Sequence, residues 1–203
     1  RSGTGDKAIA LKLCRNILIR DVTIFRGGHF AIINTGCDRG TIDNVTIDTN
    51  RDGIDIDCCK YITVTNTKVN TPSDDAIVLK SSYALKKAVP CEHILITNCL
   101  VTGYKLGTFL DGTYVPEKVN WVCGRIKLGT ESNGGYRNIT ISNCTCMWSS
   151  GLAFEEVDQG HMENICVNNI AMEHVHHYPI YITTGCRNRG PKEVTQPSSA
   201  RNI

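Results

Sequence analysis

Three aspartates in two short motifs are the residues of this sequence best suited to chemistry. Asp52 lies in Asn50-Arg51-Asp52-Gly53, and Asp74 and Asp75 follow Pro72-Ser73. If the three carboxyls converge, their like charges disfavour joint ionisation and raise the pKa of at least one of them. A carboxyl that keeps its proton near neutral pH beside ionised neighbours can act as a general acid paired with a general base. Inverting hydrolysis of a glycosidic bond needs such a pair, with the carboxyls roughly 6.5–9.5 Å apart.

The same motifs also have plainer interpretations. Asp-Gly and Pro-Ser-Asp-Asp are ordinary turn sequences. The oxygens could instead bind calcium, with Asp55 and Asp57 as further ligands, and a calcium-dependent polysaccharide lyase is therefore an alternative. A shared catalytic pocket is favoured by spacing, because Asp52 and Asp74 are 22 residues apart.

A repeated pattern supplies the elements that would bring these carboxyls together. The pattern has five positions, as in Ile62-Thr63-Val64-Thr65-Asn66: the first and third are apolar, the second and fourth can be any residue, and the fifth is Asn or Asp. The polar marker falls at positions 21, 44, 66, 98, 143 and 169, with spacings of 23, 22, 32, 45 and 26 residues. Alternation of this kind predicts a strand with one buried face. The marker indicates a bend, where Asn tolerates left-handed conformations.

Stacked copies of such a unit bury apolar faces that no single copy could bury alone. We therefore predict an all-β fold, a right-handed single-stranded parallel β-helix, in one domain over residues 1–203. The longer intervals predict loops at about 83–91 and 103–124. A β-sandwich or propeller is the alternative, but neither explains the recurring Asn as well. One coil of about 22 residues would carry Asp52 next to Asp74 and Asp75, since adjacent strands lie about 4.8 Å apart.

Composition excludes several classes of protein. The formal net charge is only +2, so a nucleic-acid partner is not expected. No apolar run approaches the roughly 18 residues of a membrane span. The eleven cysteines are an odd number, and those in strand-like segments, such as Cys99, Cys144 and Cys166, are interpreted as buried core thiols. Vicinal Cys58-Cys59 is a poor disulfide candidate.

Taken together, these motifs resemble glycoside hydrolase family 28, the polygalacturonase family, and the resemblance implies a β-helix of the pectin lyase-like type. Asn50-Arg51-Asp52 is similar to its Asn-Thr-Asp motif, and Ser73-Asp74-Asp75 is similar to its Gly/Gln-Asp-Asp motif. Segments 111–114, 124–135 and 187–191 resemble a bacterial branch of the family, of which the chain looks like a central piece, truncated at both ends. The resemblance implies that Asp74 is the general acid, that Asp52 and Asp75 together activate water, and that no metal or other cofactor is needed. It also implies a secreted or periplasmic monomer that acts on pectic polysaccharide or oligosaccharide.

The chain departs from the family at two positions. The family's Gly-His-Gly corresponds here to Cys123-Gly124-Arg125, so its histidine is missing. The Arg-Ile-Lys that grips the galacturonate carboxylate corresponds to Ala153-Phe154-Glu155. Arg125-Ile126-Lys127 has the same sequence as this family motif but lies in another coil, from which its side chains could still reach the groove. The loss of the arginine and lysine of this motif and the gain of the Glu155 carboxylate should weaken binding of an acidic sugar. We therefore expect a bond other than plain galacturonate–galacturonate, and the missing histidine keeps a non-catalytic carbohydrate-binding β-helix as a further alternative.

Further candidates surround this core. Lys80 has the parity of Asp74 and is expected to face the substrate. The other expected substrate contacts are Asp55, Arg125, Lys127, His29, Glu155 and Arg189. Tyr83, Tyr114 and Trp121 lie in or near the two loops and could stack on sugar rings. His174, His176 and His177 fit no common metal-ligand spacing and are interpreted as a solvated loop.

Overall fold

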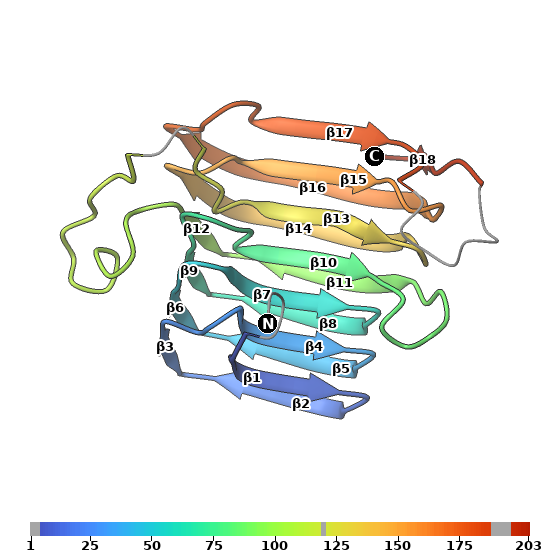
Figure 1. Cartoon of the computed structure of the whole chain (residues 1–203), viewed down its shortest axis with the longest axis horizontal. Helices are drawn as coiled ribbons and strands as arrows, with labels where there is room; N and C mark the ends of the chain where they lie inside the picture. The colour runs from blue at the N-terminus through green and yellow to red at the C-terminus, as the bar shows by residue number, and fades with distance from the viewer. Residues whose placement is uncertain (1–4, 119–120, 188–195) are drawn as a thin grey trace.

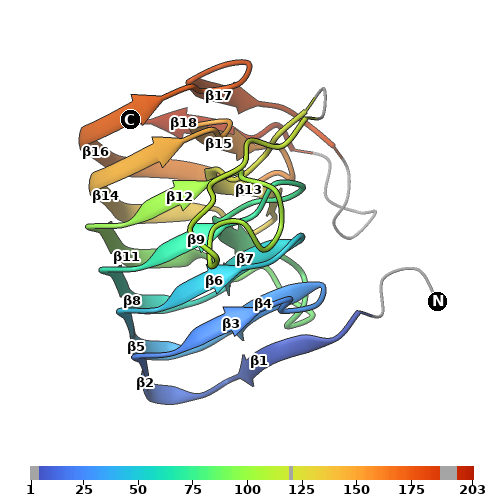
Figure 2. The same cartoon turned by 90° about the vertical axis from the view of Figure 1, so that its left-hand side faces the viewer.

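The computed structural model describes residues 5–118, 121–187 and 196–203, and in these ranges the chain forms a stack of parallel β coils (Figure 1). Every pairing between the named strands is parallel, and each strand pairs with its counterparts in the neighbouring coils. Figure 2 shows the coils stacked one above another along a single axis. Among the described residues, no helix has the length and apolar character that a membrane span requires.

Each coil contributes strands to more than one face of the stack. The first face is a seven-stranded sheet in the order β1-β4-β7-β10-β13-β15-β17. Its strands are β1 (Lys7–Lys12), β4 (Phe30–Thr35), β7 (Asp52–Asp57), β10 (Ile77–Ser81), β13 (Ile126–Ser132), β15 (Leu152–Glu156) and β17 (Ile180–Thr184). We call its outer surface the groove face, because it carries the aspartate motifs.

The remaining strands form an eleven-stranded sheet that bends around the other faces. The long strands of this sheet are β2 (Arg15–Arg20), β5 (Asp38–Asp43), β8 (Lys60–Thr65), β11 (Cys91–Thr97), β14 (Tyr136–Met147) and β16 (His161–Glu173). Its short strands are β3 (Thr23–Phe25), β6 (Thr46–Asp48), β9 (Lys68–Asn70) and β12 (Leu100–Thr102), and β18 (Ser199–Arg201) pairs with β16. Strand β14 joins the two parts, since its first half pairs with β11 and its second half with β12.

The repeated Asn or Asp provides the bend between the long and short strands. All six marker positions have a positive φ, between 51° and 59°, as in Asn44 and Asn66. This left-handed conformation is more accessible to Asn and Asp than to most other residues. The side chains also stack: Asn66 Nδ2 donates to Asp43 Oδ1 at 2.9 Å, and Asn169 Nδ2 donates to Asn143 Oδ1 at 2.7 Å. The predicted role of the marker is confirmed.

The core is a set of apolar ladders that run through successive coils. On the inner side of the seven-stranded sheet, Ile54 of β7 lies in register with Ile32 and Ile77, and all three are fully buried. Eight of the eleven cysteines are buried free thiols. Cys99 and Cys144 are buried as predicted, but Cys166 is exposed, because it occupies the outward position between the inward-facing residues of its strand. That interpretation of Cys166 was wrong.

Both predicted loops are present. One separates β10 from β11 across residues 82–90, and the other separates β12 from β13 across residues 103–125, extending to the left of the stack in Figure 1. The second loop brings the chain back to the groove face just before β13. It thereby places Cys123 and Arg125 beside the aspartate pair.

Candidate active site

The three aspartates line one groove of about 480 Å³ on the groove face. The local coil is one residue longer than the spacing of 22 suggested, since Ile54 pairs with Ile77. Gly53 N donates to the carbonyl oxygen of Asp75 at 3.0 Å, so Asp52 lies next to Asp75 along the sheet edge. The three carboxyls therefore converge, as their proposed chemistry requires. They lie closer together than the roughly 6.5–9.5 Å expected of an inverting pair, since Asp74 and Asp75 offer oxygens within 4.8 Å of each other and Asp74 hydrogen-bonds with Asp52. That expected separation was wrong.

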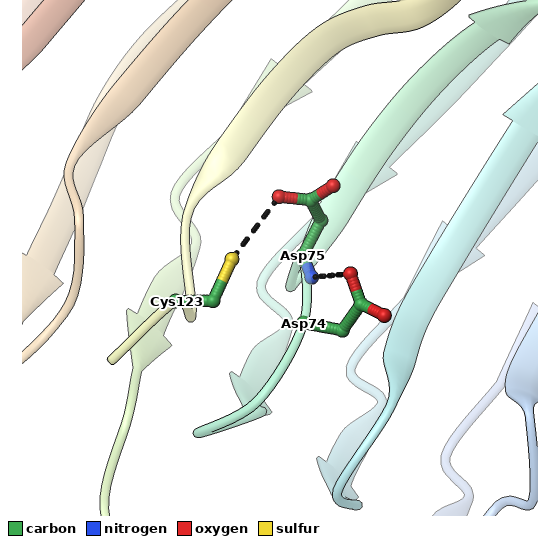
Figure 3. A group of neighbouring side chains, drawn as sticks. All are labelled: Asp74, Asp75 and Cys123. Carbon is green, nitrogen blue, oxygen red and sulfur yellow. Dashed lines mark hydrogen bonds between the residues drawn. The ribbon is translucent and has the colours of Figure 1, made fainter. Parts of the chain in front are cut away.

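Asp74 occupies the turn that precedes β10. Its Oδ1 accepts a hydrogen bond from Asp75 N at 3.1 Å, drawn in Figure 3, and Thr71 Oγ1 donates to its carbonyl oxygen at 2.8 Å. Arg51 Nη2 lies 3.1 Å from Asp74 Oδ2. Burial, followed by the negative charge of Asp52 and a hydrogen bond with it, raises the pKa of Asp74 to about 7, and Arg51 only partly offsets this. Asp74 is thus protonated under mildly acidic conditions.

Asp52 has the opposite electrostatic character. Burial alone would raise its pKa, but the ammonium of Lys80 and hydrogen bonds from Asp74 and Lys80 outweigh burial and lower it. Lys80 Nζ lies 2.8 Å from Asp52 Oδ2 and 2.6 Å from Asp55 Oδ2. Burial would lower the pKa of Lys80, yet these two carboxylates hold it above its ordinary value. Asp52 is therefore the ionised neighbour of Asp74.

The predicted substrate contacts Lys80 and Asp55 differ in their access to the groove. Lys80 faces outward, as its parity predicted, and its side chain is 15% exposed. Asp55 also borders the groove, but its side chain is fully buried against Lys80. Lys80 is therefore paired with two carboxylates, and Asp55 holds the Lys80 side chain in place.

Asp75 is surrounded by donors from the next coil. Arg125 Nε donates to Asp75 Oδ1 at 2.7 Å, and Lys127 Nζ lies 3.4 Å from Oδ2. Cys123 Sγ donates to the same Oδ1 at 3.2 Å, as Figure 3 shows. The side chains of Arg125 and Lys127 thus reach the groove from β13 and the residue before it.

Glu155 lies one coil further along, on β15. Its Oε1 is 3.4 Å from Arg125 Nη2 and 3.6 Å from Lys127 Nζ. Arg125 and Lys127 are therefore shared between Asp75 and Glu155, which joins the aspartates to the next strand in one network of charges. Such paired cations are less available to a substrate carboxylate than free ones.

The remaining candidates lie around this network or away from it. His29 lines the groove, packs edge-on against Phe30, and has its pKa lowered by burial and by the positive charge of Arg51. Arg189 lies outside the described residues. Tyr114 packs against other aromatic rings of its own loop, whereas Trp121 lines a second cavity beside Glu155.

Two features of the site were missed in the sequence. The Arg51 that replaces the family's Thr contacts Asp74, and the Cys123 thiol contacts Asp75 from the segment that lacks the histidine. Both residues lie in motifs where the sequence departs from the family. Their location in those motifs was the signal that could have assigned them a role in the site. Tyr181, which lines the second cavity, had no such signal.

A metal ion would find a mixed set of donors here. Asp74, Asp75 and Cys123 offer ligand atoms within 4.8 Å of one another. Calcium prefers oxygen ligands alone, and zinc sites favour sulfur and nitrogen. The suggested calcium ligands have other partners, since Asp55 contacts Lys80 and Asp57 accepts hydrogen bonds from Ser82 N and Oγ at 2.9 and 2.7 Å.

Comparison with protein families agrees with this architecture. The family model described as "Right handed beta helix region" matches residues 2–114, which include all three aspartates. The chain belongs to the right-handed β-helix family. The fold class predicted from the sequence is thereby confirmed, including its handedness, and the match supports the pectate-lyase/polygalacturonase-like superfamily. Comparison with curated proteins gives no match.

Proposed function

We propose that this right-handed β-helix protein is an inverting glycoside hydrolase that acts on pectic polysaccharide or oligosaccharide. The observation that carries the proposal is the contrast between two neighbouring carboxyls: the pKa of Asp74 is raised to about 7 and that of Asp52 is lowered. Two carboxyls with pKa values driven apart are the equipment of acid and base catalysis. The resemblance to glycoside hydrolase family 28 supports the same assignment.

In the proposed reaction, Asp74 donates its proton to the glycosidic oxygen as the bond to the anomeric carbon breaks. Asp52 and Asp75 orient a water molecule on the opposite face of the sugar and accept its proton. Lys80 keeps Asp52 ionised, and Arg125 and Lys127 fix the Asp75 carboxylate.

The alternatives receive less support from the site. A lyase would need a base beside the α-proton of a uronate and usually a calcium ion, whereas the arginines of this groove contact carboxylates and the proposed calcium ligands have other partners. A non-catalytic binding protein would have no need of a carboxyl with a pKa near neutrality beside an ionised one.

The test is hydrolysis of defined pectic oligosaccharides by the wild type and two variants. Asp74→Asn removes the acid and should lower the rate about 10²–10⁴-fold. Asp111→Asn is the matched control, because Asp111 is exposed on the loop and contacts Thr113 rather than the groove. Products with a double bond, or equal activity of wild type and Asp74→Asn, would rule the proposal out.

A further inference from the structure

A second cavity of about 310 Å³ lies beside the catalytic groove. Its lining includes Trp121, Arg125, Glu155, Tyr178 and Tyr181. Arg125 stands between the two spaces: it lines the cavity, its Nε contacts Asp75 of the groove, and its Nη2 contacts Glu155. A sugar chain cut at the aspartates would place a residue in this cavity where the chain passes Arg125, and the cavity has the size of a small ligand site.

Aromatic rings form the walls of the cavity. The Trp121 ring stacks on His177 with 4.1 Å between centroids, and 52% of Trp121 is exposed. Tyr181 is 41% exposed and stacks on Tyr178 at 6.1 Å. Rings that are held in place by a stacking partner and still present open surface can take an apolar face of a ligand at low entropic cost.

The charges of the cavity disfavour an acidic ligand. Among the described residues that line it, Arg125 is the one permanently charged cation, and its guanidinium is already shared by Asp75 and Glu155. Lys127, the next nearest cation of the network, is shared by the same two carboxylates. A uronate placed here would bring its carboxylate next to that of Glu155, and no described lining residue offers a free arginine or lysine to neutralise it.

We infer that this cavity is a subsite for an uncharged sugar ring, which lies against Trp121 and Tyr181 and donates hydroxyl hydrogen bonds to Glu155. The inference rests on the proposed function for its sugar ligand and makes the specificity more definite. The glycan that is cut carries a neutral residue on the Glu155 side of the aspartates. A polymer of galacturonate alone does not meet this requirement.

The test measures binding rather than turnover, in Asp74→Asn protein, which leaves the ligand intact. The probes are trigalacturonate and its carboxyl-reduced counterpart, α-1,4-linked galactotriose, which differ only in the charged groups. The chain has two tryptophans, Trp121 and Trp148, so a Trp148→Phe change makes Trp121 the sole fluorescent reporter of the cavity. The neutral trimer should bind at least about tenfold more tightly than the acidic one, because like charges are costly at close range.

Two further variants locate the effect. Glu155→Gln should narrow the preference for the neutral trimer several-fold, and Trp121→Ala should abolish calorimetric binding. Trp148→Ala is the matched control, because the Trp148 ring also stacks on a histidine, His174 at 4.3 Å, but does not line the cavity. Equal or tighter binding of trigalacturonate, no response to Glu155→Gln, or no binding of either trimer at millimolar concentration would overturn the inference.

The outcomes separate this inference from the proposed function. If the neutral trimer is preferred but no oligosaccharide is hydrolysed by the wild type, the subsite stands and the hydrolase proposal falls. If pectic oligosaccharides are hydrolysed but the acidic trimer binds more tightly, the hydrolase proposal stands and the neutral subsite falls.

Discussion

The raised pKa of Asp74 has a consequence for stability that can be measured without a substrate. The folded protein holds this proton more tightly than the unfolded chain does, since the pKa of Asp74 rises from 3.8 to about 7 on folding. The stability that Asp74 contributes through this proton is fully present below about pH 4 and is lost as the pH rises to about 7. Asp74→Asn cannot titrate and should lack this loss.

The size of the effect follows from the shift and from the exposure of the side chain. At about 1.4 kcal/mol per pH unit, the shift would correspond to about 4 kcal/mol for a fully buried carboxyl. The Asp74 side chain is 26% exposed and its neighbour Arg51 is 49% exposed, so solvent screening reduces this figure. We expect the stability of wild type relative to Asp74→Asn to fall by about 1–2 kcal/mol between about pH 4 and pH 8.

Urea unfolding of both proteins across this pH range measures the difference, and the titration of groups that do not interact with Asp74 cancels. Asp111→Asn is again the control and should show no such loss, because the pKa of Asp111 is lowered by its hydrogen bonds with Thr113. A difference between wild type and Asp74→Asn that stays constant from pH 4 to pH 8 would refute the assignment of a raised pKa to Asp74.

Three other changes have definite expected outcomes. Lys80→Met leaves the buried Asp52 and Asp55 carboxylates without their cation, so urea unfolding should show a loss of stability of about 3 kcal/mol. The acidic limb of the pH–activity profile should also move to higher pH, and an unchanged limb would contradict the role of Lys80. Asn66→Ala should lower thermal stability by about 1–2 kcal/mol, and Asn66→Gly by less, because glycine keeps the positive φ without strain. Activity should survive treatment with a chelator, whereas a calcium-dependent lyase would lose it.

The fold could be predicted because its determinants are local and repeated. A marker such as Asn66 encodes a left-handed bend, and alternation such as Ile62-Thr63-Val64 encodes a strand with one buried face. The alternation held even at Cys166, which occupies an outward position; the error there came from interpreting a cysteine as buried by its residue type rather than by its position. The extra residue in the coil from β7 to β10 was also invisible, since the marker spacing of 22 does not report on the opposite face.

The aspartates of the candidate site were predictable for the same reason, because one coil of sequence equals one step of the stack. The partners of these aspartates were less so. Pairing of Arg51 with Asp74, and of Lys80 with both Asp52 and Asp55, depends on side-chain reach rather than on register. The aromatic cavity combines the end of a long loop with residues near β17, a juxtaposition that no spacing in the sequence encodes.

The most direct test of the shared aspartate pocket is NMR of the anomeric proton during cleavage of a defined pectic oligosaccharide by the wild-type protein. Action of Asp74 as acid, with Asp52 and Asp75 on the water, predicts that the first product released has the anomeric configuration opposite to that of the bond cut. A product that retains its configuration or carries a new carbon–carbon double bond, or an intact substrate, would contradict it.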